Sequence, residues 1–440
     1  MTATQSNTQT FAHIDSKEAL SEITSKTVFV RTDFNVPLSD DKSPKVLDDT
    51  RIAAAIPTIK YLLKQNCKVV IASHLGRPKS SADSEFSLKP ILPVLSKLLG
   101  KELTQNIIFC EDTIGPKRQA IISQAAPKSV ILLENLRFYD GEQENDTTFA
   151  NELAAGIDIY VNEAFSVSHR ADASVVGVPK LLTAFAGIAL GKEVATWSKL
   201  MQEPKRPFVM IIGGAKISDK VGAVAYLSEI ADAILVGGGT ANNFLKAEGL
   251  EIYQSYLEED AQKKASRKDA NYVKVAEHLL DETRADKIVI DGYIPLPKII
   301  MPSDVIAAES MQSTDTEVVT LTSSDVLSSN SDVMYLDIGP KTISLFKEVI
   351  EEAGTIFWNG PLGVFEEKQF AQGTKEIAEA IVKSDAFSII GGGDTLGAVD
   401  SMGLLDKFDY VSVAGGAALE FLSGKKLPGI QALTKPKNEE

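Results

Sequence analysis

The sequence predicts an α/β protein built from two doubly wound domains, each with a parallel sheet between layers of helices. Short runs of β-branched and other apolar residues recur along the chain, and stretches with helical spacing of apolar residues separate them. Strands that alternate with helices in this way form parallel sheets covered on both faces. The length of 440 residues, with 44% hydrophobic content, exceeds what one domain usually holds.

Seven runs have the composition of buried strands: 27–34, 68–73, 129–135, 208–214, 233–239, 355–360 and 387–393. Helical spacing of apolar residues is clearest at 51–65, 218–231 and 368–383. The segments 255–270 and 312–332 lack strong periodicity and are expected to be peripheral insertions.

A domain boundary is predicted at 187–207, where a helical pattern ends in a charged break bracketed by prolines. The two sides differ in chemistry. Six of the nine arginines precede residue 171, whereas Gly-Gly pairs occur only from Gly213 onward. Arginine guanidinium groups and the backbone N–H groups of glycine loops bind phosphate in two different ways. Both halves are therefore predicted to bind anions.

Composition and charge exclude several classes of function. The formal net charge of -15 argues against a nucleic-acid or anionic membrane partner. No apolar run approaches the length of a membrane span, and the first residues lack the pattern of a secretory signal. Cys67 and Cys110 have no metal-ligand spacing and are expected to be buried free thiols. We therefore expect a soluble, cytoplasmic protein.

Polar residues follow the predicted strands of the first half, and the carboxyl ends of strands are where doubly wound sheets bind ligands. Asp33 and Asn35 are two apart, so their side chains point the same way. Arg51 begins a predicted helix. The N-terminal end of a helix carries partial positive charge and does not favour a positively charged side chain, so this position favours a functional role for Arg51. The candidate anion site consists of Asp33, Asn35, Arg51, His74, Arg77, Arg137 and Arg170.

Alternatives remain for these residues. Any one arginine alone can be a surface or ion-paired residue, and Asp33 with Asn35 can simply cap a turn. His74 and His169 show no metal-ligand spacing, which favours anion binding over a metal site.

Glycine-rich loops follow the predicted strands of the second half. In the loop 213–220, Lys216 and Lys220 are four apart and are expected on one face of a helix start, where a bound anion would offset their charge. The loop 391–393 offers amides at a helix N-terminus, and Asp394 adds a carboxylate that can hold Mg²⁺.

Two further loops extend this pattern. The loop 237–239 repeats the glycine turn after a strand, and the segment 358–366 combines Asn359 with Glu366, which can accept from ribose hydroxyls. A structural glycine turn is the alternative for each loop. Neither G-x-x-x-x-G-K-[ST] nor G-x-G-x-x-G occurs, and the protein-kinase catalytic loop is absent. Phosphate binding is therefore predicted to be distributed over several loops.

Taken together, the motifs resemble the phosphoglycerate kinase family, in the family's order over residues 12 to 433. They are RTDFNVPL, SHLGRPK, LLENLRF, GGAKISDK, GGGTANNFLKAEG, DIGPKT, WNGPLGVFE, GGGDT and GGAALEFLSGKKLPG. The resemblance implies two Rossmann-like domains separated by a cleft and joined by a hinge helix. The implied parts are an N-terminal domain at 1–186, a hinge at 187–206, a C-terminal domain at 207–419, and a segment 420–440 that packs back on the N-terminal domain.

The resemblance also implies an activity. This is reversible phosphoryl transfer from 1,3-bisphosphoglycerate to MgADP, giving 3-phosphoglycerate and MgATP, in glycolysis and gluconeogenesis. The enzyme would be a monomeric phosphotransferase with a carboxyl acceptor, with Mg²⁺ as cofactor and small molecules as its partners. Transfer would be in line after hinge closure. The reacting carboxylate is already ionised at neutral pH, so no general base is required.

The site residues implied by the resemblance match positions in both halves. The substrate contacts are the seven residues of the candidate anion site. The nucleotide contacts are Gly214, Ala215, Lys216, Lys220, Gly238, Leu336, Asn359, Pro361, Glu366, Gly392, Gly393, Asp394 and Thr395, with Asp394 as the Mg²⁺ ligand. The catalytic set is Arg51, Lys216, Lys220 and Gly393.

The chain departs from the family pattern in the stretch 163–172 and in the last glycine loop. The family commonly reads aspartate, Ala-Phe, then Gly-Thr or Gly-Ala before His-Arg-Ala-His. Here the stretch begins with Glu163, has Ser166 after Ala-Phe, and ends with Asp172, a negative charge beside a polyanion site. The last loop usually reads Ser-Thr-Gly-Gly-Gly, whereas this chain has Val413 and Ala414.

Two rival interpretations are disfavoured by the sequence. A catalytically silent relative would be favoured by losses at its reactive positions, yet all four are present: Arg51, Lys220, Glu366 and Asp394. A nucleotide-dependent dehydrogenase is disfavoured because the dinucleotide fingerprint is absent.

Overall fold

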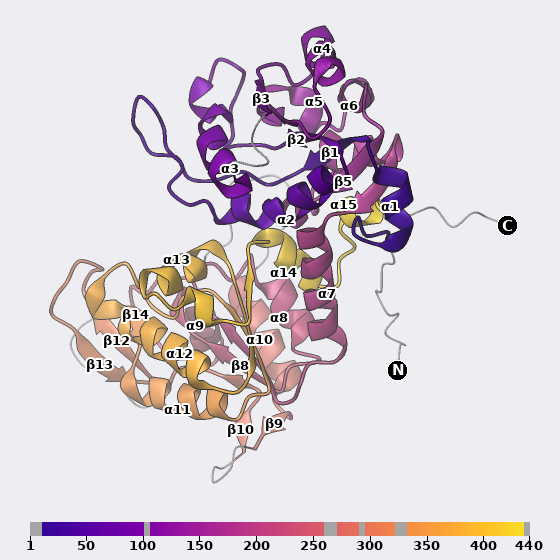
Figure 1. Cartoon of the computed structure of the whole chain (residues 1–440). Helices are drawn as coiled ribbons and strands as arrows, with labels where there is room; N and C mark the ends of the chain where they lie inside the picture. Colours follow the sequence, from indigo (N-terminus) through magenta and orange to yellow (C-terminus); the bar gives the residue numbers. More distant parts are fainter. Residues whose placement is uncertain (1–10, 101–105, 259–270, 290–294, 322–331, 435–440) are drawn as a thin grey trace. The chain divides into compact units, whose positions relative to one another are not determined.

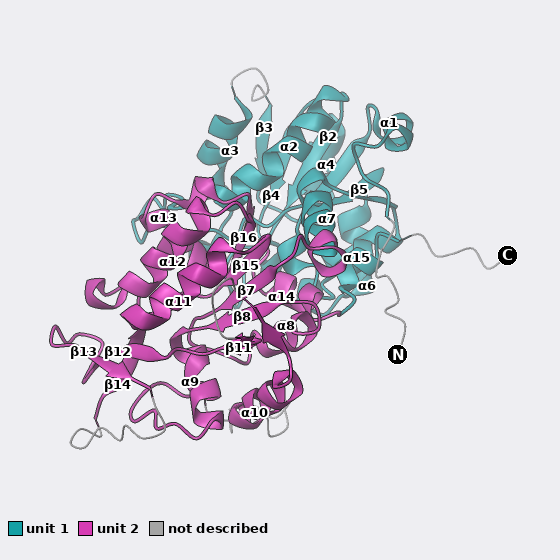
Figure 2. Cartoon of the chain, turned by 90° about the horizontal axis from the view of Figure 1, so that it is seen from below, with its two compact units in different colours: residues 1–198, 425–440 teal, residues 199–424 magenta. Residues whose placement is uncertain are grey.

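The computed structural model describes residues 11–100, 106–258, 271–289, 295–321 and 332–434. The chain divides into two compact units, which Figure 2 shows in different colours: Met1–Ser198 with Lys425–Glu440, and Lys199–Gly424. The division falls within helix α7 (Ile188–Gln202). Each unit contains a six-stranded sheet whose described strand pairs are all parallel, so the predicted α/β fold class is confirmed.

The sheet of unit 1 has the strand order β3-β4-β2-β1-β5-β6. Its strands are β1 (Thr27–Arg31), β2 (Lys68–Ala72), β3 (Ile107–Cys110), β4 (Val130–Leu133), β5 (Ile159–Asn162) and β6 (Thr183–Ala186). Arg31, the last residue of β1, pairs with Ala72 on one side and Asn162 on the other. The loops after β1, β2 and β5 therefore leave the sheet at the same edge.

Helices pack on this sheet through apolar residues spaced three or four apart. Those assigned to unit 1 are α1 (Lys17–Ile23), α2 (Thr50–Lys64), α3 (Leu92–Leu99), α4 (Pro116–Gln124), α5 (Asp140–Gln143), α6 (Thr147–Ala154), α15 (Pro428–Gln431) and most of α7. Ile59 of α2 lies in the same core cluster as Val28 and Val30 of β1. Phe29, on the opposite face of β1, stacks on Tyr160 with ring centroids 5.9 Å apart. Alternate residues of β1 thus fill both faces of the sheet.

The C-terminal segment packs within unit 1. The backbone N–H of Gly429, in α15, donates to the carbonyl of Ser168 at 2.8 Å, and Asn162 donates a longer bond to the Gly429 carbonyl. Ser168 lies in the loop after β5, so these bonds join α15 to that loop and to the end of β5.

Unit 2 contains a parallel sheet in the order β11-β8-β7-β15-β16-β17 and a separate antiparallel sheet in the order β13-β12-β14. The parallel strands are β7 (Phe208–Ile212), β8 (Ala233–Val236), β11 (Ile299–Ile300), β15 (Thr355–Asn359), β16 (Phe387–Gly391) and β17 (Tyr410–Ser412). The antiparallel strands are β12 (Asp304–Ala308), β13 (Glu317–Thr320) and β14 (Met334–Ile338), and β9 (Lys287–Ile288) pairs with β10 (Leu296–Pro297).

The helices of unit 2 are α8 (Val221–Leu227), α9 (Gly238–Ala247), α10 (Tyr272–Thr283), α11 (Pro340–Glu351), α12 (Gln372–Lys383), α13 (Gly393–Ser401) and α14 (Gly416–Leu422). Five of them, α8, α9, α12, α13 and α14, follow its parallel strands, whereas α10 follows α9 and α11 follows β14. Figure 1 shows α11 and α12 side by side, and Phe346 and Ile377 from these helices share a core cluster with Trp358 of β15.

Each of the seven predicted strands is present, and each ends one to three residues earlier than predicted, because its last polar or glycine residues leave the ladder. The segment 312–332, predicted to be a peripheral insertion, contains β13, whose first two residues are exposed. Residues 259–270 and 322–331 of the two predicted insertions lie outside the described residues. Cys67 and Cys110 are free and buried, as predicted. No helix in the described ranges is long and apolar enough to cross a membrane.

Candidate functional site

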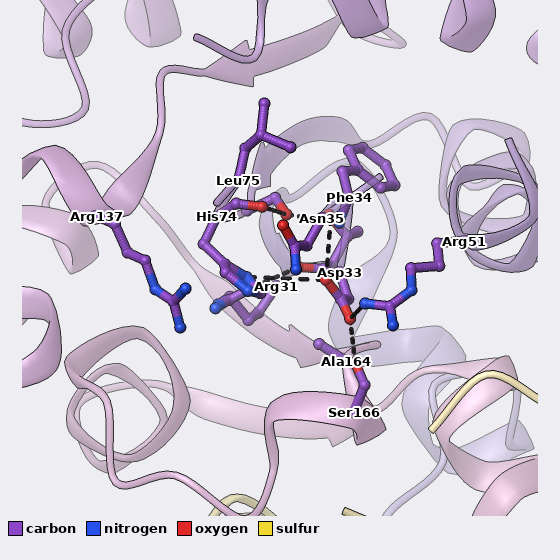
Figure 3. A network of polar contacts seen from close by, with 12 residues as sticks. Arg31, Asp33, Phe34, Asn35, Arg51, His74, Leu75, Arg137, Ala164 and Ser166 are labelled. Atoms are coloured by element: carbon purple, nitrogen blue, oxygen red, sulfur yellow. Dashed lines mark hydrogen bonds and ion pairs between the residues drawn. The ribbon is translucent and has the colours of Figure 1, made fainter. Parts of the chain in front are cut away.

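The first group of candidate residues surrounds the Asp33 carboxylate, at the carboxyl end of β1 (Figure 3). Oδ2 of Asp33 accepts hydrogen bonds from the Arg51 guanidinium and the Ser166 hydroxyl, each at 2.5 Å. Oδ1 accepts from the backbone N–H of Asn35 at 3.1 Å. Asp33 is 9% exposed, whereas the Arg51 side chain is 32% exposed. Three donors therefore fix a nearly buried carboxylate, and part of the Arg51 side chain remains accessible.

His74 lies beside the same carboxylate, with its Nδ1 3.8 Å from Oδ1 of Asp33. Burial lowers the pKa of His74 well below its usual range, and the nearby charges of Arg31, Arg170 and Arg51 lower it further. The ring is therefore neutral at pH 7, and its approach to Asp33 is a polar contact rather than an ion pair. A neutral imidazole offers one donor and one acceptor.

Gly76 links two other candidates through its backbone. Its N–H donates to the Asn35 side chain at 2.8 Å, and its carbonyl accepts from Arg137 at 2.6 Å. Gly76 has φ +60°, and a Cβ there would lie 2.2 Å from the ring of Phe86. The turn after β2 therefore requires glycine, and it sets the positions of Asn35 and Arg137.

Two candidates stand apart from this network. Arg77 is exposed and makes none of these hydrogen bonds. Arg170 is half-buried, and its Nε approaches Nε2 of His169 at 3.4 Å. Arg170 still contributes charge to the group, because it lowers the pKa of His74.

Sequence reasoning missed a buried charged pair beneath the site. Arg31 and Glu142 are fully buried, with Nη2 3.8 Å from Oε1. The Ser174 hydroxyl bridges them, accepting from Nε of Arg31 and donating to Glu142. Burial raises the pKa of Glu142, and the charge of Arg31 opposes that rise. The only sequence signal was the position of Arg31 two residues before Asp33.

Asp172, the acidic departure from the family pattern, is 6% exposed rather than a surface residue. Burial raises its pKa, and the charges of Arg31 and Arg170 oppose this shift. The added negative charge is therefore placed among arginines.

The second group of candidates lies in unit 2, where glycine turns follow parallel strands. Helices α9 and α13 begin at Gly238 and Gly393, directly after the turns that end β8 and β16. The first N–H groups of a helix have no partner within the helix and favour an anion. A Cβ at Gly393 would meet no described atom within 4 Å, so there is room for a ligand beside the first turn of α13.

The glycine loops of unit 2 hold one another by backbone contacts. The N–H of Gly214 donates to the carbonyl of Pro361 at 2.6 Å, and a Cβ at Gly238 would lie 2.9 Å from that same oxygen. The Thr240 hydroxyl lies 3.1 Å from the carbonyls of both Gly213 and Gly214. Sequence reasoning missed Thr240, although a hydroxyl two residues after Gly238 was a signal for it.

The prediction that Lys216 and Lys220 share a helix face is wrong. Helix α8 begins at Val221, and Lys220 is its N-cap, so Lys216 lies in the preceding loop. The glycine loop uses more residues than predicted before the helix can start. The Lys220 ammonium instead donates to the Lys216 carbonyl at 3.2 Å.

Lys220 is nonetheless close to acidic residues. Burial lowers its pKa, while the charges of Asp219, Asp394 and Glu258 oppose that shift. This position therefore combines a partly desolvated cation with the Asp394 carboxylate.

A model of the phosphoglycerate kinase family matches residues 18–425 of the chain. The chain belongs to the phosphoglycerate kinase family. A phosphoglycerate kinase of Desulforapulum autotrophicum is 44% identical over 414 residues, which cover 94% of this chain and 98% of the relative. That of Moorella thermoacetica is 42% identical over the same length, with the same coverage.

Solved phosphoglycerate kinase structures agree with the fold. The enzyme from Coxiella burnetii has a TM-score of 0.77 at 37% identity and covers 94% of this chain and 97% of its own. The enzyme from Pyrococcus horikoshii has a TM-score of 0.78 at 32% identity, covering 96% and 98%. The chain is therefore a phosphotransferase with a carboxyl acceptor, with phosphoglycerate kinase activity in glycolysis and gluconeogenesis.

The remaining residues expected from phosphoglycerate kinases lie around the glycine turns. Thr395 accepts from the N–H of Gly360 at 2.7 Å, which ties α13 to the turn after β15. The side chains of Asn359, Pro361 and Leu336 are buried, whereas Ala215, Glu366 and Asp394 are exposed.

Asp394 suits a magnesium ion that arrives with a nucleotide. It lies in the first turn of α13 and is exposed, and carboxylate oxygen is a preferred Mg²⁺ ligand. The residues described contain no group of three or more His, Cys, Asp or Glu side chains able to hold a metal ion. Mg²⁺ usually binds through one or two carboxylates plus substrate phosphates, so a single Asp394 fits.

Proposed function

We propose that unit 1 binds 3-phosphoglycerate or 1,3-bisphosphoglycerate and that unit 2 binds MgADP or MgATP. This division of the two ligands between the units is supported by the different chemistry of the two groups of candidate residues. Unit 1 gathers Arg51, His74 and Arg137 around Asp33 and Gly76, whereas unit 2 offers helix N-termini after glycine turns. The boundaries at 1–186, 187–206 and 207–419, with 420–440 on the first domain, belong to the same proposal.

The substrate set consists of Asp33, Asn35, Arg51, His74, Arg77, Arg137 and Arg170. Guanidinium groups present a planar fork that matches carboxylate and phosphate oxygens in pairs, and charge-assisted bonds of this kind are strong. Asp33 supplies a fixed acceptor for a hydroxyl, and neutral His74 adds a group that can donate without adding charge. This combination suits an anionic hydroxy acid.

The nucleotide set consists of Gly214, Ala215, Lys216, Lys220, Gly238, Leu336, Asn359, Pro361, Glu366, Gly392, Gly393, Asp394 and Thr395. Backbone amides at the starts of α9 and α13 suit phosphate oxygens, and the exposed Glu366 suits ribose hydroxyls. Asp394 would hold the Mg²⁺, which neutralises charge on the phosphates when bound.

Transfer is proposed to occur in line after closure about the hinge segment 187–206. Positioning and electrostatic stabilisation dominate phosphoryl transfer, so the catalytic set, Arg51, Lys216, Lys220 and Gly393, acts by stabilising charge on the transferring group. Closure would exclude water that otherwise hydrolyses the acyl phosphate. The monomeric state and cytoplasmic location remain predictions.

A coupled assay tests the proposal. Purified protein is mixed with ATP, Mg²⁺ and 3-phosphoglycerate, and ADP formation is followed. We expect turnover that requires all three, and glycerate without its phosphate should be a much poorer acceptor. Folded protein that fails to turn over would support the silent-relative interpretation instead.

A further inference from the structure

Ser166 offers a hydroxyl at the centre of the substrate set that the proposed function does not use. It lies in the short 3-10 helix Phe165–Val167 after β5, in the position where the family pattern has glycine after Ala-Phe. Its hydroxyl reaches Oδ2 of Asp33, which is 133 residues away in sequence. A glycine has no side chain to make this contact, so the contact belongs to this chain's own sequence.

We infer that Ser166 is a positioning residue that holds the Asp33 carboxylate for the acid substrate. This rests on the proposed roles of Asp33 and Arg51 in binding that substrate. Oδ2 of Asp33 accepts from two donors, Arg51 and Ser166. Arg51 is charged and has its own proposed contact to the reacting group, whereas Ser166 is neutral and has no such proposed contact.

The two donors differ in how free they are to move. Arg51 is long, and its side chain is partly exposed, so an arriving anion can compete with Asp33 for its guanidinium. Ser166 is short and is fixed by its backbone, with the neighbouring Val167 N–H bonded to Ala164. When Arg51 turns to the substrate, the Ser166 hydroxyl and the Asn35 N–H remain to hold Asp33. The hydroxyl also keeps two lone pairs that can accept from the substrate.

The test compares Ser166→Ala and Ser166→Gly with the wild-type enzyme in steady-state kinetics. Both variants remove the hydroxyl, but only the alanine keeps Cβ. We expect the KM for 3-phosphoglycerate to rise about 3- to 10-fold in both variants, the change that the typical net contribution of one hydrogen bond produces. The KM for ATP should be unchanged, and kcat should change less than the KM for the acid. Ser166→Thr should restore much of the affinity.

Ser168→Ala is the matched control, because the Ser168 hydroxyl lies in the same loop but donates to the Ala164 carbonyl instead. We expect it to lower the melting temperature without changing the KM for 3-phosphoglycerate. An unchanged or lower KM in both Ser166 variants would overturn the inference, as would an equal rise in the Ser168 variant.

Asp33→Asn separates this inference from the proposed function. If Asp33→Asn raises the KM for 3-phosphoglycerate and the Ser166 variants do not, the Ser166 role alone is wrong. If Asp33→Asn also leaves it unchanged, the proposed substrate role of Asp33 fails as well.

Discussion

At the scale of single residues, Arg51 has two opposed tasks. In the structure its guanidinium pairs with Asp33, which neutralises a nearly buried carboxylate. In the proposed reaction it stabilises the transferring phosphoryl group. Charge develops on that group in the transition state, and donors already in position stabilise it without reorganisation. Its partial exposure reconciles these tasks, since the side chain is not locked into the ion pair.

Arg51→Ala should lower kcat about 10²- to 10³-fold, the size typical for removal of one transition-state donor. The KM for ATP should change little, because the proposed nucleotide contacts lie in unit 2. Steady-state kinetics with both substrates varied measure this, and unchanged turnover would remove Arg51 from the catalytic set.

Single-residue patterns predicted several of the residues that lie together around Asp33, but not their contacts. Asp33, His74 and Arg137 were identified because polar residues follow apolar strands. The bond between Ser166 and Asp33 was not, since it depends on β1 and β5 being neighbours and on the rotamer of a serine in a family departure. Asp172 was expected near a polyanion site, but its burial among arginines required the fold.

At the scale of elements, Glu163 joins the loop after β5 to two helices. Its carboxyl group accepts from the Thr58 hydroxyl of α2 at 2.6 Å and from the N–H groups of Ala189 and Leu190 at the start of α7. A Cβ at Gly187 would lie 1.8 Å from its Oε2, so the side chain fits only against glycine. One buried acid therefore fixes the N-terminus of α7.

Burial raises the pKa of Glu163 to about 8, which predicts a pH dependence of stability. In the unfolded chain the carboxyl group has a pKa of about 4.3. Between that pH and the folded value, the folded protein keeps the carboxyl proton and the unfolded chain releases it. The stabilisation is therefore complete at low pH and is lost as pH rises through about 8. In urea unfolding, the stability of the wild type relative to Glu163→Gln should fall between pH 5 and 8.5, by at most about 1.4 kcal/mol per pH unit. Parallel curves for the two proteins would contradict this assignment.

Most of the predicted strands are buried on both faces, so they appear as continuous apolar runs. Burial alone did not suffice, because the short strand β5 is fully buried and was not among the predicted runs. Strand β13 was missed because its first two residues are exposed and its run is short. The start of α8 was placed too early because the glycine loop before it extends to Lys220.

At the scale of the whole molecule, each of the chain's two units contains a six-stranded parallel sheet, and we propose that the two units bind different substrates. The sequence predicted this division from the distribution of arginine and glycine. It could not predict the antiparallel sheet β13-β12-β14, whose pairing depends on residues far apart in sequence. The central claim is that each half binds its own substrate.

Calorimetric titration of the full chain with 3-phosphoglycerate and, separately, with MgADP tests this claim most directly. Arg137→Ala should weaken 3-phosphoglycerate binding about tenfold or more and leave MgADP binding unchanged, because it removes a charge-assisted bond from unit 1 only. Asp394→Asn should do the reverse. If either variant weakened the binding of both ligands equally, or weakened the binding of the ligand assigned to the other unit, the claim that each half binds its own substrate would be contradicted.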